Sequence, residues 1–244
     1  MRGRMTTPSP ATPATDDLVR WTPARRPDRS TVLGGSRVRL EPLDASRHAA
    51  DLFDAAQGEG ADPSLWRYLG YGPFDDVADY GAWATAHQDS TDPLFYAIVD
   101  TATGRAAGVA SYLRIEPEHG VIEIGHIWFG GRLQRTPAAT EAIHLLARHA
   151  FDELGNRRLE WKCDAANARS RAAAQRFGFT YEGTFRQHMI VKGRNRDTAW
   201  FAIIDGEWPA VRAAFEAWLE PENFDASGRQ RASLAQLRAG AGAE

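Results

Sequence analysis

The spacing of hydrophobic residues changes several times between residues 36 and 220. Apolar residues that alternate with polar ones predict strands, and apolar residues three and four positions apart predict amphipathic helices. These patterns predict, in order, a strand at 37–42, helices after Asp44 and Pro73, strands at 94–100, 105–115 and 121–129, a helix at 137–154, a strand at 157–164, a helix at about 168–177, strands at 179–191 and 197–205, and a helix at 209–219.

The connections between several of these strands are short. Residues 101–104 and 116–120 are rich in residues that favour turns, and residues 192–195 separate the last two strands. Short connections place consecutive strands side by side and antiparallel. The order of elements predicts a single mixed α/β domain over residues 31–222.

The two ends of the chain have a different composition. Residues 1–30 contain five of the thirteen prolines, and such a segment buries too little apolar surface to offset its ordering entropy. We expect a flexible N-terminal arm there, with Trp21 as the one candidate anchor. Residues 223–244 are rich in Ala, Gly and Arg, and we expect a tail that forms at most a short helix.

The overall composition narrows the class of protein. Hydrophobic residues make up 43% of the chain and charged residues 25%, with a formal net charge of −3, so no overall positive field attracts nucleic acid or anionic lipid. A single cysteine, Cys163, excludes an intrachain disulfide or a multi-cysteine zinc site. With no apolar run long enough to span a bilayer, we expect a cytoplasmic protein without metal, membrane or nucleic-acid partners.

The junction between strand 121–129 and helix 137–154 carries the clearest chemical signal. Thr136 suits the N-cap and Pro137 the first helical position, and the N-terminus of a helix offers unpaired N–H groups to an anion. Arg132 and Arg135 could add charge-assisted bonds to a phosphate. The alternative is a capped amphipathic helix with solvated arginines.

Several motifs in fixed order resemble the GNAT superfamily of acetyl-CoA-dependent N-acyltransferases, especially the branch with the ribosomal-protein N-terminal acetyltransferases. They are Glu123-Ile-Gly with Trp128-Phe129, Asn167-Ala-Arg-Ser170, Ala174-Gln-Arg-Phe-Gly-Phe179 and Glu207-Trp-Pro209. The resemblance implies a mostly antiparallel sheet of about seven strands, flanked by helices and splayed between the family's fourth and fifth strands, here 121–129 and 157–164. Acetyl-CoA would be the acyl donor, and a homodimer stays open.

The resemblance also implies which residues bind acetyl-CoA. They are the strand residues Ile127, Trp128 and Phe129, the loop and helix residues Arg132, Leu133, Gln134, Arg135, Thr136, Ala138 and Ala139, and Asn167 and Ser170 on the next helix. Two departures stand out. Arg135 and Pro137 replace the small residues of the family's pyrophosphate loop, and Ala174 replaces a tyrosine that many members have.

For catalysis, the resemblance implies Ser170 on the side of the departing thiol and Glu123 as the base. Ser170 could instead satisfy the helix backbone, and Glu123 could pair with a neighbouring arginine. The acceptor amine would contact Tyr68 and Tyr71 in the aromatic segment 66–74, together with His126 and His188 on strands. Each histidine could equally be packed or solvated. Cys163 has no base placed beside it by the sequence, so a covalent acyl-enzyme is not expected.

The sequence therefore predicts an N-acetyltransferase (an acyltransferase of the EC 2.3.1 type) that moves an acetyl group to a primary amine by direct attack on the thioester. The acceptor could be a protein N-terminus or a small amine. Two alternatives stay open, namely a catalytically silent acyl-CoA-binding domain and an antibiotic-modifying acetyltransferase.

Overall fold

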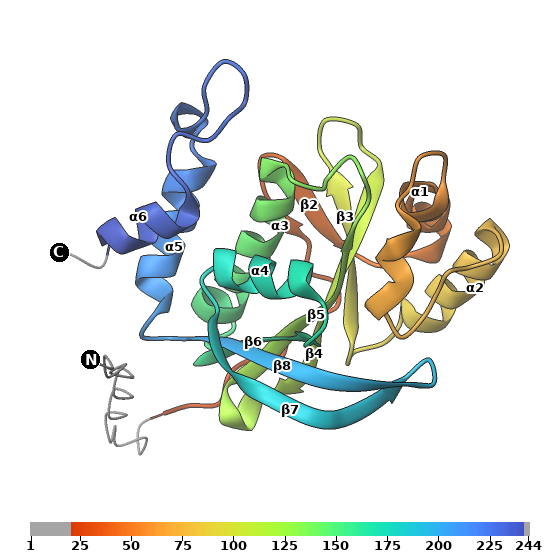
Figure 1. The fold of residues 1–244 in the computed structure, drawn as a ribbon, viewed down its shortest axis with the longest axis horizontal. Coiled ribbons are helices and arrows are strands. Elements are labelled where there is room, and N and C mark those ends of the chain that lie inside the picture. Colours follow the sequence, from red (N-terminus) through yellow and green to blue (C-terminus); the bar gives the residue numbers. More distant parts are fainter. Residues whose placement is uncertain (1–20, 242–244) are drawn as a thin grey trace, which may run out of the picture.

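The computed structural model describes residues 21–241, which form one sheet with helices on both faces (Figure 1). The sheet has eight strands in the order β1-β2-β3-β4-β5-β6-β8-β7. The strands are β1 (Leu33–Gly34), β2 (Val38–Pro42), β3 (Leu94–Asp100), β4 (Ala106–Glu116), β5 (Val121–Phe129), β6 (Arg158–Asp164), β7 (Thr180–Val191) and β8 (Arg194–Ile204). All neighbours are antiparallel except β5 and β6.

Six α-helices and several shorter turns connect and cover the strands. They are α1 (Ala45–Gln57), α2 (Val77–His87), α3 (Pro137–Arg148), α4 (Ala168–Arg176), α5 (Trp208–Leu219) and α6 (Leu234–Ala241), with the short helices η2 (Pro63–Tyr68), η3 (Pro117–His119), η4 (His149–Glu153) and η5 (Pro221–Asn223). The predicted mixed α/β fold is confirmed. The additional strand is β1, whose two residues are too few to give a periodic pattern in the sequence.

Two apolar clusters lie on opposite faces of the sheet. One face packs against α3, α4 and α5 around residues such as Ile122, Ile143 and Phe201. The other packs against α1 and α2 around Leu52, Trp66 and Val109. The hydrophobic alternation along β5 follows from this, because successive strand side chains point to opposite faces.

Both ends of the described chain contact the domain. Ala24 N donates to Pro117 O at 3.0 Å and Arg25 N donates to Leu154 O at 2.7 Å, so residues 24 and 25 lie against η3 and the end of η4 rather than in a free arm. At the other end, Leu234 of α6 is buried in the cluster around α5. The expected arm at residues 1–20 lies outside the described residues.

Several termini of helices are stabilised as their sequences predict. Asp44 caps α1 by accepting from the N–H groups of Ser46 and Arg47, and Asp76 caps α2 in the same way. The helix predicted at 137–154 is α3 followed by one π-helical turn, η4, and Gly155 ends it with a φ of 76°. No helix within residues 21–241 has the length and apolar character that a membrane crossing requires.

Candidate functional site: the gap between β5 and β6

The parallel pair β5 and β6 stays together for only three residues. Val121–Glu123 pairs with Arg158–Glu160, and no pairing follows further along either strand within the described residues. The cause lies on β5, where the register against β4 shifts between Gly125 and Trp128 and His126 adopts a φ of 51°. Such a bulge bends the strand and ends its regular pairing. The edges of β5 and β6 therefore separate into a gap.

The gap leads to the N-terminus of α3 through the loop 130–136. In this loop, the N–H groups of Leu133 and Gln134 donate to Gly130 O, and Thr136 N donates to Leu133 O. Thr136 also caps α3, because its Oγ1 accepts from Ala139 N at 3.4 Å. These expected cofactor donors are therefore used inside the loop, and the Leu133 side chain is buried in the core.

Other N–H groups of the loop and the first helical turn remain open. Within residues 21–241, the N–H groups of Arg132, Arg135 and Ala138 have no hydrogen-bond acceptor. Arg135 adopts a φ of 62°, which lets the chain turn sharply before Pro137. Both arginine side chains are exposed beside this turn. Open N–H groups, the helix dipole and two guanidinium groups together form a good anion-binding site.

One wall of the gap is formed by β6 and α4. Asn167 caps α4 by accepting from Ser170 N at 3.1 Å, and Ser170 Oγ accepts from Trp161 Nε1 at 3.0 Å. The sequence analysis missed Trp161, although a buried indole N–H needs an acceptor. Cys163 is buried next to Ser170, and burial raises the pKa of the Cys163 thiol. The thiol therefore stays protonated and is a poor nucleophile.

Glu123 lies at the point where the gap begins, and it is bound by two cations. Its Oε2 lies 2.5 Å from Arg114 Nη1 and 3.0 Å from Lys162 Nζ. The side chains of Glu123 and Lys162 are each only 4% exposed. The sequence analysis included the pairing of Glu123 with an arginine as one alternative, but it did not identify Lys162. One signal was available, because the chain has only two lysines, Lys162 and Lys192.

These ion pairs continue across four strands as an alternating row, which we call the ion-pair ladder. Its members, in spatial order, are Glu182, Arg158, Glu160, Lys162, Glu123 and Arg114. Burial opposes ionisation of Glu160, but hydrogen bonds from Lys162 and Arg158 hold its pKa below the usual value. The ladder has three charges of each sign, and each of its buried inner members, Glu160, Lys162 and Glu123, lies beside an opposite charge.

His126 and Tyr71 lie together on the face of the sheet that carries the ladder. Their rings are stacked at 5.7 Å, and Tyr71 is also stacked on Trp83 at 4.5 Å. Burial, with a smaller contribution from the neighbouring charge of His87, lowers the pKa of His126 to about 4. His126 is therefore neutral at pH 7. Burial likewise raises the pKa of Tyr71.

His188 has a more open position on β7. Its Nδ1 lies 2.9 Å from Thr198 Oγ1, and its ring helps to line a hollow of about 430 Å³ together with Lys162 and Trp200. The Lys162 ammonium lies 3.8 Å above the Trp200 ring. The structure thus places His188 next to the ladder and His126 in an aromatic cluster, although the sequence analysis gave both the same role.

Tyr68 contacts the β6 side of the gap, whereas its neighbours Trp66 and Tyr71 contact β5. Its hydroxyl donates to Ala166 O, just beyond β6, at 3.2 Å, whereas Trp66 packs on Trp128 of β5 at 6.0 Å. The Trp128 side chain belongs to this apolar cluster, so only its backbone could take part in binding within the gap. The side chains of Ile127 and Phe129 pack toward the opposite cluster.

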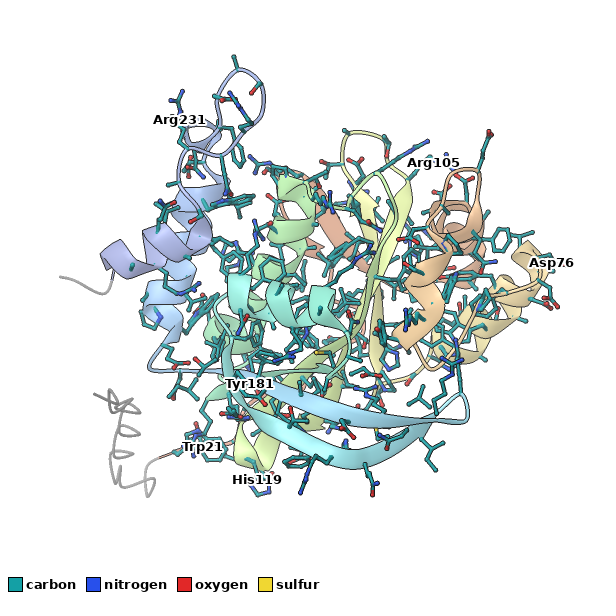
Figure 2. The ribbon with its side chains drawn as sticks, in the orientation of Figure 1. Trp21, Asp76, Arg105, His119, Tyr181 and Arg231 are labelled. Atoms are coloured by element: carbon teal, nitrogen blue, oxygen red, sulfur yellow. The ribbon has the colours of Figure 1, made fainter. Side chains whose placement is uncertain are left out.

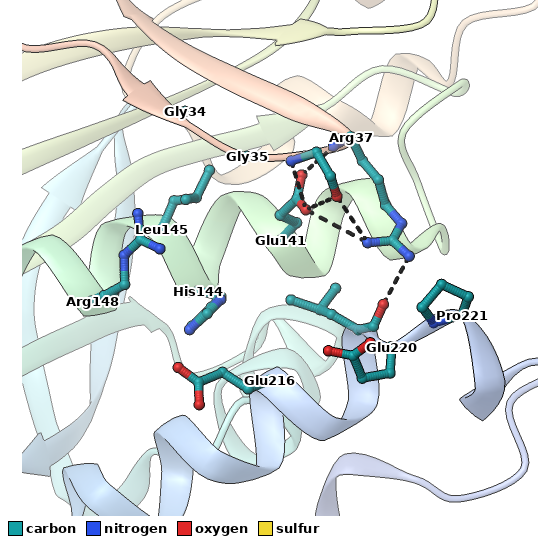
Figure 3. A pocket seen from close by; sticks show the side chains of 12 residues that line it. Gly34, Gly35, Arg37, Glu141, His144, Leu145, Arg148, Glu216, Glu220 and Pro221 are labelled. Atoms are coloured by element: carbon teal, nitrogen blue, oxygen red, sulfur yellow. Dashed lines mark hydrogen bonds and ion pairs between the residues drawn. The ribbon is translucent and has the colours of Figure 1, made fainter.

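A second hollow, of about 340 Å³, is enclosed by α3, α5 and the β1–β2 turn and lies away from the gap between β5 and β6 (Figure 3). Several of its polar groups are bonded to one another or to the backbone around the hollow. Glu141 accepts from the N–H groups of Arg37 and Val38 at 2.6 and 2.8 Å, and Arg37 donates to Leu219 O. Figure 2 shows the side chains of the described residues on the ribbon. Within residues 21–241, no three His, Cys, Asp or Glu side chains lie close enough together to hold a metal ion.

Comparison with known proteins agrees with this geometry. The profile of the acetyltransferase (GNAT) domain family matches residues 37–180, more than half of the chain. The chain belongs to the GNAT acetyltransferases. This GNAT chain is 49% identical to a GCN5-related N-acetyltransferase from Brucella melitensis, with a TM-score of 0.87 over 90% of this chain and 98% of that one.

Two further relatives extend the comparison. A GNAT-family structure from Chromobacterium violaceum is 44% identical, with a TM-score of 0.74 over 82% of this chain and 99% of that one. The Bacillus subtilis protein named "Putative ribosomal N-acetyltransferase YdaF" is 29% identical over 69% of this chain and 90% of its own length. The predicted family resemblance is thereby confirmed, and acetyl transfer is the activity that this GNAT fold implies.

Proposed function

We propose that this chain transfers the acetyl group of acetyl-CoA to a primary amine, on a protein N-terminus or a small molecule. The amine nitrogen bonds to the thioester carbonyl carbon, the carbon–sulfur bond breaks, and the thiolate takes up a proton. The amine loses one proton to the protein or to water. No acyl-enzyme is needed, which agrees with the protonated, buried Cys163 thiol.

The observation that carries this proposal is the short pairing of β5 with β6. Only three residue pairs hold the two strands together before they separate, and the gap ends at open N–H groups of Arg132, Arg135 and Ala138. A linear thioester arm can bond to the free strand edges while its diphosphate lies at the N-terminus of α3. Arg135 and Pro137 change the loop, but they leave these three donors open.

Ser170 is the group that we assign to the departing thiol. Its Oγ accepts from Trp161 Nε1, which fixes the oxygen and leaves the hydroxyl hydrogen free to point into the gap. A hydroxyl there can donate a hydrogen bond to the developing thiolate, and solvent then supplies the proton. Asn167 keeps the start of α4 in place through its bond to Ser170 N.

His188 is the group that we assign to the proton of the amine. Glu123 and Glu160 are each engaged in ion pairs with two cations of the ladder. Hydrogen bonds from Lys162 and Arg158 also lower the pKa of Glu160, which makes its carboxylate a weak proton acceptor. His126 has a pKa of about 4 and cannot hold a proton at pH 7. The His188 ring can donate from Nδ1 to Thr198 Oγ1 and accept at Nε2 beside the hollow. Glu123 then serves as a fixed charge at the start of the gap.

The acceptor's own chemistry makes a moderate base sufficient. An N-terminal amine with a pKa near 7.7–8.0 is about a tenth neutral at pH 7, whereas a lysine amine is almost wholly protonated. The name of the Bacillus subtilis relative, which refers to ribosomal acetylation, supports a protein N-terminus as the acceptor.

The test measures free thiol released from acetyl-CoA in the presence of a panel of amines. The panel holds peptides with free N-termini, the same peptides with acetylated N-termini, polyamines and aminoglycosides, and mass spectrometry locates the acetyl group. We expect acetylation of free N-termini or small amines only. Binding of acetyl-CoA without transfer to any amine would instead support the silent acyl-CoA-binding alternative.

A further inference from the structure

Residues 62–74, which we call the lid, lie over both sides of the gap. Trp66 and Tyr71 pack on Trp128 and His126 of β5. Tyr68 reaches Ala166, which follows β6. The lid therefore connects the two strand edges whose separation creates the gap.

The tip of the β7–β8 hairpin is joined to the lid by one ammonium group. Lys192 Nζ donates to Trp66 O at 3.1 Å, to Tyr71 O at 3.1 Å and to Gly72 O at 2.5 Å. A lysine ammonium has three donors, so the lid carbonyls use all of them. In Figure 1, the β7–β8 hairpin lies along the bottom of the view, and its tip is on the side of α2.

The turn at the hairpin tip holds Lys192 toward the lid. Lys192 and Gly193 form a two-residue turn with φ values of 49° and 72°, and Val191 pairs with Arg194 across it. Two consecutive positive φ angles are typical of a type I′ turn, which matches the twist of the strands it joins. The ammonium is thus presented by a regular hairpin, and in the part of the chain that the structure describes its hydrogen-bond partners are three neutral carbonyls of the lid.

The other attachments of the lid differ in strength and place. At its end, Phe74 is fixed to α1 by two hydrogen bonds with Gln57, at 2.6 and 2.8 Å. At its start, Asp62 pairs with Arg169, whose side chain is 82% exposed, and such an exposed pair contributes little. Between these ends, four polar contacts cross the gap within residues 21–241, of which Lys192 supplies three and Tyr68 the fourth.

We propose that Lys192 is a specificity-determining residue, a latch that keeps the lid closed over the acceptor side of the gap. With the latch closed, an acceptor reaches the gap as a slender chain end or a small amine, and a lysine on the surface of a folded protein does not reach it. This inference rests on the proposed function for its acceptor, but the latch itself can be tested without any acceptor.

The first experiment measures amide hydrogen exchange of the full chain. Lys192→Met removes the ammonium and keeps the apolar stem. The control is Arg194→Met, in the same turn, because Arg194 makes no hydrogen bond to the lid within residues 21–241. We expect exchange in residues 62–74 to become at least about tenfold faster in Lys192→Met only. Unchanged exchange in the lid, in a variant that folds normally, would overturn the latch.

The second experiment compares two acceptors that share one N-terminal sequence. One is a short peptide, and the other is a folded protein whose N-terminus has no flexible extension. We expect Lys192→Met to raise the ratio of kcat/KM for the folded protein over the peptide by about tenfold, and Arg194→Met to leave it unchanged. An unchanged ratio in Lys192→Met would overturn the role in specificity.

The two proposals fail in different ways. If the wild-type chain transfers acetyl to none of the amines, the proposed function and the specificity role both fail, but faster lid exchange in Lys192→Met would still support the latch. If the wild-type chain is active and both readouts are unchanged in Lys192→Met, only the inference about Lys192 fails.

Discussion

On the face of the sheet covered by α3 and α5, Ile122, Ile124 and Leu159 pack into one continuous apolar core. On the opposite face, the same two strands carry Glu123, Glu160 and Lys162 of the ion-pair ladder. Neighbouring residues of β5 and β6 thus enter two different environments. The face that packs against α3 and α5 contributes stability through burial of apolar area. The opposite face, which carries the ladder, keeps fixed charges beside the gap.

The two faces respond differently to substitution. Apolar packing tolerates small changes in shape and charge state poorly, but it does not depend on charges that salt can screen. The ladder is a chain of paired charges, so each member depends on its neighbours, and removing one leaves another without a full partner.

Removing Lys162 is expected to have the largest effect. In Lys162→Met, Glu123 and Glu160 each lose one cation in a buried setting, and we expect the free energy of unfolding to fall by about 3 kcal/mol. Denaturant unfolding measures this change. In the double variant with Glu123→Gln, the two effects should not add, because the residues are in direct contact. A loss below about 0.5 kcal/mol would mean that the ladder is not a coupled unit.

His188→Gln is expected to lower kcat/KM by about 100-fold with the best acceptor found, since general-base catalysis contributes at least this much. The decrease of kcat/KM at low pH that depends on the enzyme's base should also disappear. The matched variant is His119→Gln, because His119 lines the same hollow and has no assigned role. An unchanged pH profile in His188→Gln would remove His188 from the mechanism.

Acid is expected to destabilise the packing of α3 against α5 through His144. This ring is buried against Phe215, at 5.2 Å between centroids. Burial, followed by the charge of Arg148, lowers its pKa from 6.5 to about 4. The unfolded chain therefore binds a proton at a higher pH than the folded chain does. Stability falls as the pH drops from 6.5 toward 4, and at pH 5 the loss from this histidine is about 2 kcal/mol.

His144→Phe should remove this part of the pH dependence, because phenylalanine keeps the ring packing and cannot take a proton. The measurement is denaturant unfolding at pH 7 and at pH 5. His126 titrates in the same direction, so a smaller loss between these pH values should persist. If His144→Phe and the wild-type chain lose the same stability between pH 7 and pH 5, the assignment of His144 as a neutral ring in the folded chain at pH 5 is wrong.

Ser170→Ala is expected to have the smallest effect. Ser170 lies in the first turn of α4, next to Trp161 of β6. The substitution removes one hydroxyl while Asn167 continues to cap α4. We expect kcat to fall by about tenfold with little change in the affinity for acetyl-CoA, measured by calorimetry. Equal losses in kcat and affinity would place Ser170 in cofactor binding and not at the departing thiol.

The sequence predicted most elements of this fold because their signals are local. Strands β3 and β5 have the predicted bounds, since each is a mainly apolar run with turn-forming residues beside it. Thr136 and Pro137 likewise marked the start of α3. By contrast, the packing of residues 24 and 25 against η3 and η4 depends on hydrogen bonds to residues far along the chain, which no local pattern contains.

The alternation of elements, the caps and the family motifs can be read from local sequence, because each depends on residues within a few positions of one another. Which charged and aromatic groups meet at the gap depends on how the chain folds. Lys162 contacts Glu123 across two strands, and Lys192 contacts carbonyls about 120 residues away in the chain. Such contacts form only when the chain folds and brings distant segments together, so the order of residues in the chain does not reveal them.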